Sequence, residues 1–471
     1  MQVGGLKNKN VLVLGLGRSG MAAATLLWRD GANVVVRDEG DDDVLRDRAQ
    51  RLRRLGVRVE LGSSFDAMAR FDLAVVSPGI GPERPIVQQV VRAKTPVLSE
   101  LELAYRFCLC PIVAVTGTNG KTTTTELITW MLQHCGKRVI PAGNIGYALS
   151  EAAEQSAGLD ALVVEVSSFQ LEKIERFKPD IGIWLNLTPD HLDRHGTMED
   201  YARAKARLFM NQDASNTAIV GTQALDWARK VGCKFRGRLM TFSADGQQAD
   251  LWLDAEDGQT IWCWLPECRG VVLRMDETAL RGAHNAENIM AAIAAGVAMG
   301  LPVRQIREAM MTYGPAPHRC EYVAEIGGVT YINDSKATNL DAVRRALETF
   351  DGRIVLIAGG RNKGMDFRQL RDVVARKGKG AVLIGETQQA LLDAWGDVTV
   401  CVCAGSMEAA VRAAAELASA GDTVLLSPAC ASFDMFENYE HRGEEFKRCV
   451  LSRLSEAAQS LVNPPPTTRR F

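Results

Sequence analysis

The chain has 471 residues, which predicts about three domains at ~150 residues each. Its 55 basic and 57 acidic residues leave a formal net charge of −2, so the composition does not favour a nucleic-acid or anionic-membrane partner. The 11 cysteines form no C-x-x-C pairs of the zinc-binding kind, and no apolar run reaches the ~18 residues of a membrane span. We therefore expect a cytoplasmic protein whose cysteines are reduced thiols.

Short β-branched runs alternate with longer helical stretches, a pattern typical of parallel sheets covered by helices. The runs that we predict as strands are 11–14, 33–36, 73–76, 112–116, 161–165, 181–185, 218–221, 354–358, 381–384 and 422–426. Alternating residues at 251–253 and 261–264 predict antiparallel strands beside the parallel sheet. The fold class is therefore α/β, with predicted domains 1–107, 108–315 and 316–460 and a disordered tail at 461–471.

The first predicted strand, 11–14, runs into a glycine-rich turn and an apolar helix. The turn reads Gly15-Leu16-Gly17-Arg18-Ser19-Gly20, and Asp38 ends the next strand, 18 residues beyond Gly20. This is the dinucleotide fingerprint, in which the glycines let a phosphate approach the backbone and the acid can accept from a ribose hydroxyl. The motif alone leaves open whether the ligand is NAD or another nucleotide diphosphate.

A second phosphate-binding motif follows the strand at 112–116. It reads Gly117-Thr118-Asn119-Gly120-Lys121-Thr122-Thr123 and is shorter than the standard P-loop, because Val115 stands where the first glycine is expected. Backbone N–H groups and a helix N-terminus bind phosphate in such a turn, a lysine adds positive charge, and a threonine hydroxyl can ligate Mg²⁺. An ordinary strand–helix turn is the alternative, but it does not explain the lysine and threonine together.

Two later segments of the same predicted domain carry candidate metal ligands. The strand 161–165 ends in Glu165, and a strand-end acid beside a P-loop is where a Mg²⁺ ligand is expected, although a solvent-facing carboxylate is the alternative. The segment 186–195 contains clustered Asp and His residues, among them His191. This cluster can bind either a second cation or the substrate.

Polar residues are also dense at two strand ends of the third predicted domain. The segment 332–339 contains Asp, Ser, Lys, Thr and Asn, which fits ligand contact, with helix capping by Asp334 or Ser335 as the alternative. The segment 425–434 repeats the arrangement of a strand followed by a polar turn, and the helix after it carries Tyr439.

Together these segments resemble the Mur ligases of peptidoglycan synthesis, up to about residue 455. The most specific stretches are 117–123, 186–191, 331–339 and 427–446. The first is shared with folylpolyglutamate synthases, and the last is similar to the D-glutamate-adding members. The Asp-Asn-Pro-Arg motif expected of diaminopimelate- or lysine-adding members is absent.

The resemblance implies three Rossmann-like domains with mostly parallel sheets, the central one a P-loop-type ATPase domain. The first would bind the UDP of UDP-N-acetylmuramoyl-L-alanine, the second ATP and two Mg²⁺ ions, and the third D-glutamate, with closure bringing them together. The implied reaction is a two-step amide synthesis through an acyl phosphate, carried out by a monomer.

The resemblance also implies roles for individual residues. The UDP-substrate contacts are Leu16, Ser19, Asp38, Gly79 and Asn144. The ATP contacts are Gly117, Thr118, Asn119, Gly120, Lys121, Thr122, Thr123, Asn288, Arg319 and Asp334. The metal ligands are Thr122, Glu165, His191 and Lys205, the last as a carbamate formed with CO₂, and the D-glutamate contacts are Thr338, Lys363, Ser432 and Tyr439. The implied catalytic residues are Lys121, His191, Lys205 and Lys336.

Without the resemblance some of these residues read differently. Lys205 is then a solvated helix lysine, and Asn288 is a polar residue on an alanine-rich helix. Other functions also stay open: a nicotinamide dehydrogenase built on the first motif, a P-loop regulatory switch, another Mur ligase, or a folylpolyglutamate synthase. Redox turnover would identify the first, and phosphate release without an acyl acceptor and an amine would identify the second.

Overall fold

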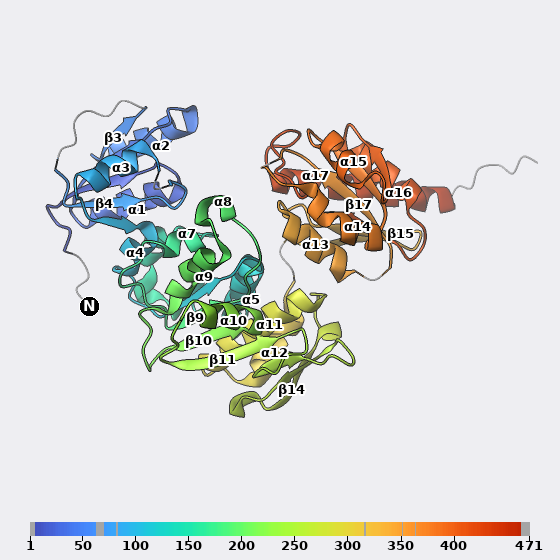
Figure 1. The fold of residues 1–471 in the computed structure, drawn as a ribbon, viewed down its shortest axis with the longest axis horizontal. Helices are drawn as coiled ribbons and strands as arrows, with labels where there is room; N and C mark the ends of the chain where they lie inside the picture. The colour runs from blue at the N-terminus through green and yellow to red at the C-terminus, as the bar shows by residue number, and fades with distance from the viewer. Residues whose placement is uncertain are drawn as a thin grey trace, which may run out of the picture. The chain divides into compact units, whose positions relative to one another are not determined.

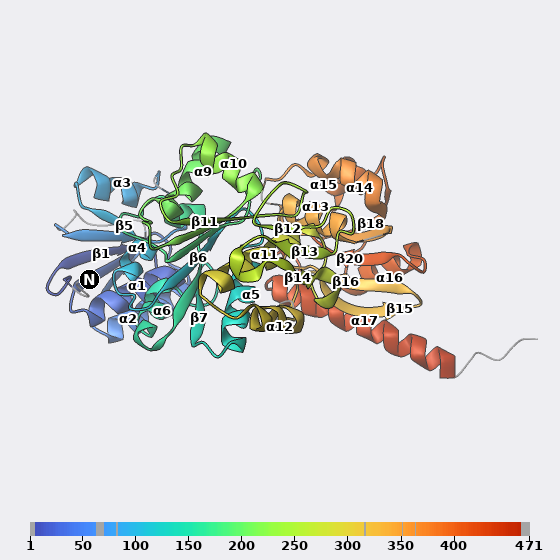
Figure 2. The same cartoon turned by 90° about the horizontal axis from the view of Figure 1, so that it is seen from below.

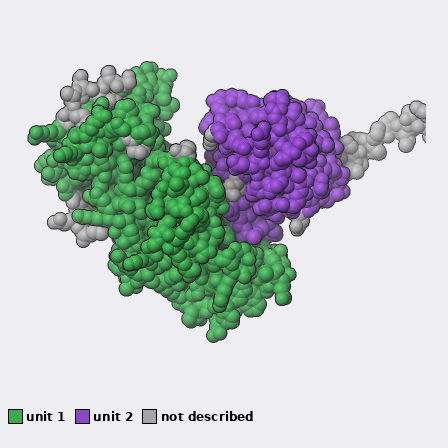
Figure 3. All heavy atoms as spheres, in the orientation of Figure 1, with its two compact units in different colours: residues 1–278, 285–313 green, residues 279–284, 314–471 purple. Residues whose placement is uncertain are grey.

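The computed structural model describes residues 5–62, 70–81, 83–314, 317–350, 352–362 and 364–462. They form three sheets covered by helices (Figure 1). The chain divides into two compact units, which Figure 3 colours separately. Unit 1 comprises Met1–Thr278 with Asn285–Tyr313, and unit 2 comprises Ala279–His284 with Gly314–Phe471.

The first sheet is fully parallel and has the order β3-β2-β1-β4-β5. Its strands are β1 (Asn10–Leu14), β2 (Asn33–Asp38), β3 (Arg58–Leu61), β4 (Leu73–Val76) and β5 (Val97–Ser99), and its helices are α1 (Arg18–Arg29), α2 (Asp43–Arg54), α3 (Pro85–Arg92) and α4 (Glu100–Tyr105). Successive residues of β1 enter two different core clusters, so both faces of the sheet are buried. The strand order reverses between β1 and β4, which is where ligands bind in such sheets.

The second sheet has the order β14-β13-β12-β11-β10-β9-β6-β8-β7. Its strands are β6 (Ile112–Thr116), β7 (Val139–Gly143), β8 (Ala161–Glu165), β9 (Ile181–Trp184), β10 (Thr217–Gly221), β11 (Arg238–Ser243), β12 (Leu251–Leu253), β13 (Thr260–Cys263) and β14 (Gly270–Arg274). The strands are parallel from β7 to β12, while β13 and β14 are antiparallel to their neighbours. The predicted antiparallel extension is therefore confirmed.

Eight helices accompany this sheet in the described residues. They are α5 (Lys121–His134), α6 (Leu149–Ala153), α7 (Ser168–Leu171), α8 (Leu192–His195), α9 (Met198–Ala206), α10 (Thr222–Lys230), α11 (Ala283–Ala298) and α12 (Val303–Thr312). Near the edge of the sheet, a disulfide joins Cys263 to Cys268. The prediction that the cysteines are all reduced thiols is therefore wrong for this pair, because a short turn after β13 brings the two side chains together; the other nine are free.

The third sheet has the order β15-β16-β20-β17-β18-β19, with only β15 antiparallel. Its strands are β15 (Glu321–Ile326), β16 (Val329–Asn333), β17 (Ile354–Gly359), β18 (Gly378–Ile384), β19 (Val400–Cys403) and β20 (Thr423–Leu426), and its helices are α13 (Leu340–Thr349), α14 (Arg371–Lys377), α15 (Gln388–Trp395), α16 (Met407–Leu417) and α17 (Tyr439–Val462). Helix α17 packs along β15 and β16 (Figure 2). It includes residues 461 and 462, which we predicted as tail, and residues 463–471 lie outside the described part.

The ten strands predicted from the sequence correspond to β1, β2, β4, β6, β8, β9, β10, β17, β18 and β20. Strands such as β3 and β7 escaped prediction because β3 carries alternating charges and β7 contains a proline and a glycine. The domain boundaries near 107 and 315 stay predictions, and residue 315 is not among the described residues. Within the described ranges, no helix is long and apolar enough to cross a membrane.

Within unit 1, helix α4 joins the first sheet to the elements of the second. The buried Glu102 carboxylate accepts hydrogen bonds from the backbone N–H groups of Glu175, Arg176 and Phe177 through Oε2, at 2.8, 3.0 and 2.9 Å. The neighbouring Glu100 accepts from the Ser150 N–H at 2.6 Å. These contacts fix α4, and with it the first sheet, against α6 and against the segment that follows α7.

Candidate active site

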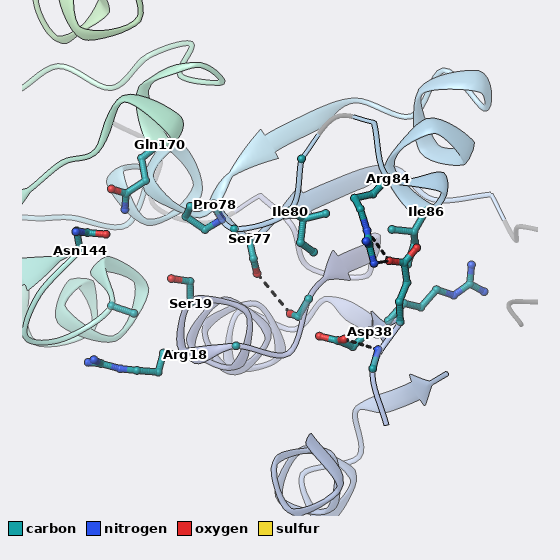
Figure 4. Close-up of a pocket in the computed structure, with 18 of the residues that line it drawn as sticks. Arg18, Ser19, Asp38, Ser77, Pro78, Ile80, Arg84, Ile86, Asn144 and Gln170 are labelled. Atoms are coloured by element: carbon teal, nitrogen blue, oxygen red, sulfur yellow. Dashed lines mark hydrogen bonds and ion pairs between the residues drawn. The ribbon is translucent and has the colours of Figure 1, made fainter. Parts of the chain in front are cut away.

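A cavity of about 770 Å³ lies at the carboxyl ends of β1 and β4 (Figure 4). Of the predicted UDP-substrate contacts, four line it: Ser19, Asp38, Gly79 and Asn144. Leu16 is fully buried and is not one of its lining residues. Arg84 and Gln170, which the sequence prediction did not include, also line the cavity.

The glycine-rich turn at this cavity is closely packed. A Cβ at Gly20 would lie 1.8 Å from the Gly15 carbonyl oxygen, so only glycine lets helix α1 approach the strand. The Asp38 carboxylate accepts from the Leu16 N–H at 2.6 Å and from the Gly40 N–H at 2.9 Å. Asp38 therefore fixes the two loops of the cavity, in addition to any contact with a ribose.

The phosphate loop connects β6 to α5. Gly120 has φ +81°, and a Cβ there would lie 2.2 Å from Asn288 Oδ1, so the position requires glycine. Asn186 Oδ1 accepts from the Thr118 and Asn119 N–H groups at 3.1 and 2.9 Å, which holds the loop open as a concave turn. Sequence reasoning did not assign this bridging role to Asn186.

The lysine and threonines of the motif lie where the loop enters α5. Lys121 Nζ donates to the carbonyl oxygens of Gly117 and Thr118 at 3.0 and 2.7 Å, so its charge lies over the loop. Thr122 and Thr123 occupy the first turn of α5 and are buried. The positive end of the α5 dipole and the lysine charge therefore act on the same small volume.

The predicted magnesium ligands Thr122 and Glu165 are in contact. Thr122 Oγ1 donates to Glu165 Oε2 at 2.7 Å, and Asn144 Nδ2 donates to Oε1 at 2.8 Å. Hydroxyl and carboxylate oxygens suit Mg²⁺, which binds through one or two carboxylates together with phosphate oxygens and water. The described residues contain no group of three His, Cys, Asp or Glu side chains that could hold a metal ion.

Lys205, on α9, is a buried lysine beside the same loop. Its side chain is almost completely buried, and Nζ donates to the Gly117 carbonyl oxygen at 2.7 Å and lies 4.6 Å from the Tyr201 ring centre. Burial, followed by the charge of Lys121, lowers the Lys205 pKa well below its usual value. The structure thus excludes the alternative of a solvated helix lysine.

His191 and Asn288 differ in exposure: the His191 side chain is partly exposed, whereas Asn288 is buried. His191 has φ +54°, an uncommon backbone conformation, and its side chain is 49% exposed and packs edge-on against Phe169. Asn288 is buried on α11, accepts from Thr124 Oγ1 at 3.1 Å and donates to Asn285 Oδ1 at 3.1 Å. Its observed contacts therefore hold α11 against α5, and an ATP contact stays a prediction.

In unit 2, the predicted residues gather at the ends of β16 and β20. Asp334 is buried, accepting from Ser427 Oγ at 2.8 Å and the Cys320 N–H at 3.2 Å, and burial raises its pKa to about 7. Arg319 contributes a buried Nε that has no hydrogen-bond partner among the described residues. Lys336 Nζ lies 5.4 Å from the Tyr439 ring centre.

Two of the three remaining D-glutamate predictions, Thr338 and Ser432, lie among the described residues. Thr338 is half-buried just before α13, and Ser432 is buried in the turn after β20. Lys363 lies outside the described residues. Their roles stay predictions.

Arg442 is a buried cation of unit 2 that the site prediction left out. It donates through Nε to Ser335 Oγ at 3.0 Å, through Nη2 to the Ser335 carbonyl at 2.8 Å and through Nη1 to the Cys430 carbonyl at 3.1 Å. Burial lowers its pKa to about 10. Arg442 thus connects the two polar loops that the sequence analysis identified. The only sign of this role in the sequence is a positively charged residue on an otherwise apolar helix face.

Replacing Asp334 with asparagine should flatten the pH dependence of stability. The folded state raises the pKa of this carboxyl from 3.8 to about 7, so folding retains a proton that the unfolded chain releases. The free energy of unfolding of the wild type should therefore fall by up to roughly 4 kcal/mol as the pH rises from about 4 to about 7, and should fall no further above that pH. Urea unfolding at several pH values measures the slope.

Asp393→Asn, at an exposed position of α15, is the matched control and should keep the wild-type slope. An unchanged slope in Asp334→Asn would contradict the burial argument.

The two nucleotide-type loops, the strand-end carboxylate and the three α/β sheets define a nucleotide-binding enzyme with a phosphate loop. Models of protein families match three stretches: Mur ligase MurD-like, N-terminal domain at 9–99, Mur ligase middle domain at 115–296, and Mur ligase, glutamate ligase domain at 318–430. A UDP-N-acetylmuramoylalanine–D-glutamate ligase of Pelotomaculum thermopropionicum is 45% identical over 451 residues, covering 94% of this chain and 98% of its own. The chain belongs to the Mur ligase family, as its sequence motifs predicted.

Further relatives extend the comparison. The enzyme of the same name from Acidobacterium capsulatum is 41% identical over 463 residues, covering 96% of this chain and 98% of its own. The solved UDP-N-acetylmuramate-alanine ligase of Thermotoga maritima is 17% identical with a TM-score of 0.58, covering 95% of this chain and 100% of that one. A pseudomurein peptide ligase type C of Methanothermus fervidus is 16% identical with a TM-score of 0.59, covering 95% and 100%. These structures confirm the predicted three-domain α/β fold.

Proposed function

We infer that this chain is an ATP-dependent amide ligase that adds D-glutamate to UDP-N-acetylmuramoyl-L-alanine in peptidoglycan precursor synthesis. Relatives named for this reaction match it over nearly their whole length, at 45% and 41% identity. The observation that carries the inference is the meeting of Lys121, Lys205 and the Thr122–Glu165 pair at one phosphate loop. Such a site neutralises charge on a triphosphate.

The first step of the reaction brings together two anions that repel each other, the L-alanyl carboxylate and the γ-phosphate of ATP. The L-alanyl carboxylate attacks the γ-phosphorus of ATP, giving an acyl phosphate and ADP, and the D-glutamate amine then attacks the acyl carbon and displaces phosphate. Lys121, the backbone N–H groups of the loop and the α5 N-terminus lower the repulsion and position the phosphates. Thr122 and Glu165 would hold Mg²⁺, which would supply further neutralisation of the triphosphate.

We propose that Lys205 works as a carbamate that, with His191, holds a second magnesium ion. Its burial and lowered pKa favour the neutral amine, which can attack CO₂ and lose a proton as the N–C bond forms. The product has anionic oxygens, which are ligands that Mg²⁺ prefers, instead of a cation. His191 has an unusual backbone conformation and a half-exposed side chain, and its ring centre lies 6.5 Å from that of Tyr201 on the same helix as Lys205.

The other predicted residues extend this proposal. Leu16, Ser19, Asp38 and Gly79 of the first domain, with Asn144 of the second, form the UDP-substrate site, supported by the four that line the cavity. Asn288, Arg319 and Asp334 contact ATP, and Lys336 stabilises a phosphate or the acyl phosphate. The D-glutamate contacts are Thr338, Lys363, Ser432 and Tyr439. We expect a cytoplasmic monomer with no nucleic-acid or membrane partner.

An assay of ADP release with a set of candidate amines tests this function. With UDP-N-acetylmuramoyl-L-alanine and ATP present, ADP release should be strong with D-glutamate and weak with L-glutamate, L-lysine or diaminopimelate. Equal or faster turnover with one of those three amines would overturn the assignment. ADP release without any amine would instead favour a nucleotide switch, and NAD(P)-dependent redox turnover would favour a dehydrogenase.

A further inference from the structure

Five side chains of unit 1 form one continuous stack of rings and cations, in the order Arg194, Phe169, His195, Tyr201 and Lys205. Arg194 lies 3.9 Å from the Phe169 ring centre, and Lys205 Nζ lies 4.6 Å from that of Tyr201. Between them, His195 stacks on Phe169 at 5.3 Å and on Tyr201 at 4.9 Å, with interplanar angles of 22° and 28°. The stack draws its members from the three short helices α7, α8 and α9.

The two ends of the stack contact different ligand sites. At one end, Arg194 Nη1 donates at 3.3 Å to the carbonyl of Pro78, a residue that lines the cavity of the first domain. At the other end, Lys205 donates to the Gly117 carbonyl, and the Tyr201 hydroxyl lies 3.3 Å from Thr118 Oγ1. The stack therefore joins the sugar-nucleotide cavity to the phosphate loop through direct contacts.

His195 is the central layer and is fixed on all sides. Its side chain is 5% exposed, Nε2 lies 2.9 Å from Ser168 Oγ, and Nδ1 lies 3.7 Å from Glu172 Oε1. Helix α8 is a single turn that ends at His195 and is followed by Gly196, with φ +79°, so it has little rigidity of its own. The orientation of the Tyr201 ring, and with it of Lys205, depends on the histidine ring packed against it.

We propose that His195 is a positioning residue, and that the stack couples the sugar-nucleotide cavity to the phosphate loop. A substrate that moves the Pro78 loop changes the Arg194 contact, and close-packed rings pass a displacement on because they have no free space between them. The proposal deepens the ligase reaction and rests on that proposed function for its kinetic effects, although the coupling itself is a property of binding.

Two substitutions of His195 distinguish the effect of its ring from the effect of its hydrogen bond. H195Q keeps a polar group for Ser168 and removes the ring, whereas H195F keeps the ring and removes the bond. We expect H195Q to lower kcat ~10-fold or more, because small misplacements of catalytic groups are costly, while each substrate's KM stays within ~3-fold. H195F should keep most of the wild-type kcat.

The readout that a merely structural role would not move is the coupling between ligands. In the wild type, saturating UDP-N-acetylmuramoyl-L-alanine should change the Kd of a non-hydrolysable ATP analogue by a factor of ~5 or more, measured by calorimetry. H195Q should bring this factor close to ~1, and H195F should retain it. H134Q, the same exchange at an exposed position of α5, is the matched control and should leave kcat and coupling unchanged.

Several results would overturn the proposal: no coupling in the wild type, wild-type coupling in H195Q, or equal losses in H195Q and H195F. If H195Q does not fold by circular dichroism, F169L removes a neighbouring layer and must lose coupling for the proposal to stand. Failure of the proposed function has a different signature, because the wild type would then release no ADP with D-glutamate, whereas the binding measurement still tests the stack.

Discussion

Replacing Lys121 with alanine is expected to lower kcat by at least ~10²–10³-fold, the usual loss when one preorganised charged donor is removed. The Lys121 ammonium lies over the loop, 3.0 and 2.7 Å from the carbonyl oxygens of Gly117 and Thr118, so it is already in place before the transition state forms. Its charge offsets the negative charge that develops as the γ-phosphoryl group is transferred. ADP release at saturating substrates measures the effect.

The fold should survive this change, because Lys121 is half-buried and packs no apolar core. A thermal unfolding midpoint within a few degrees of wild type would establish that. Lys137→Ala, an exposed lysine just after α5, is the matched control and should keep full activity. Residual Lys121→Ala activity above about a tenth of wild type would show that Lys121 is not a principal catalytic group.

Lys205→Ala should be nearly inactive and partly rescued by short-chain carboxylic acids. A protonated Lys205 has no lone pair and repels a cation, and its neutral amine is a nitrogen donor where Mg²⁺ prefers oxygen. The carbamate instead offers anionic oxygens. Alanine leaves space at a fully enclosed position beside the Gly117 carbonyl, and a small carboxylate can fill that space with anionic oxygens. Lys205→Glu should retain some activity for the same reason. The measurement is kcat as a function of added acetate or propionate.

Lys230 provides a close control for this experiment. Its Nζ lies 4.5 Å from the Trp227 ring centre, much as that of Lys205 lies over Tyr201, but Lys230 is exposed and pairs with Glu199. Lys230→Ala should therefore keep full activity and show no response to carboxylic acids. Near-normal activity of Lys205→Ala, or an unmodified Lys205 in a substrate-bound crystal structure, would refute the carbamate role.

Local sequence patterns predicted the parts of the site that depend on adjacent residues or on parallel strand ends. The phosphate loop is contiguous, so its glycines, lysine and threonines could be recognised directly. Glu165 could be predicted because parallel strands end at the same edge of a sheet, and the structure indeed brings it to 2.7 Å from Thr122. The same logic located the cavity at the end of β1.

Residues whose environment is set by tertiary packing could not be predicted in this way. The charged neighbours of Lys205 in sequence suggest solvent, and only the packing of α9 against the loop buries it. Arg442 is likewise buried by loops far away in the chain, and Asn186 acquires its role only because β9 lies beside β6. The Cys263–Cys268 disulfide depends on a turn that the cysteine spacing alone did not indicate.

The Glu102 carboxylate also bears on how this chain can be recombined with its relatives. It precedes the predicted boundary at 107, yet its hydrogen-bond donors are the N–H groups of residues 175–177. In a chimera that exchanges residues 1–107 alone, a loop of the other parent must provide three matching N–H donors to a fully buried carboxylate. A mismatch there lowers the stability of the fold by about several kcal/mol. A crossover placed before α4, near Ser99, keeps donor and acceptor in the same parent. Helix α4 should therefore be exchanged together with the second sheet of unit 1 and not with the first sheet, which it follows in sequence.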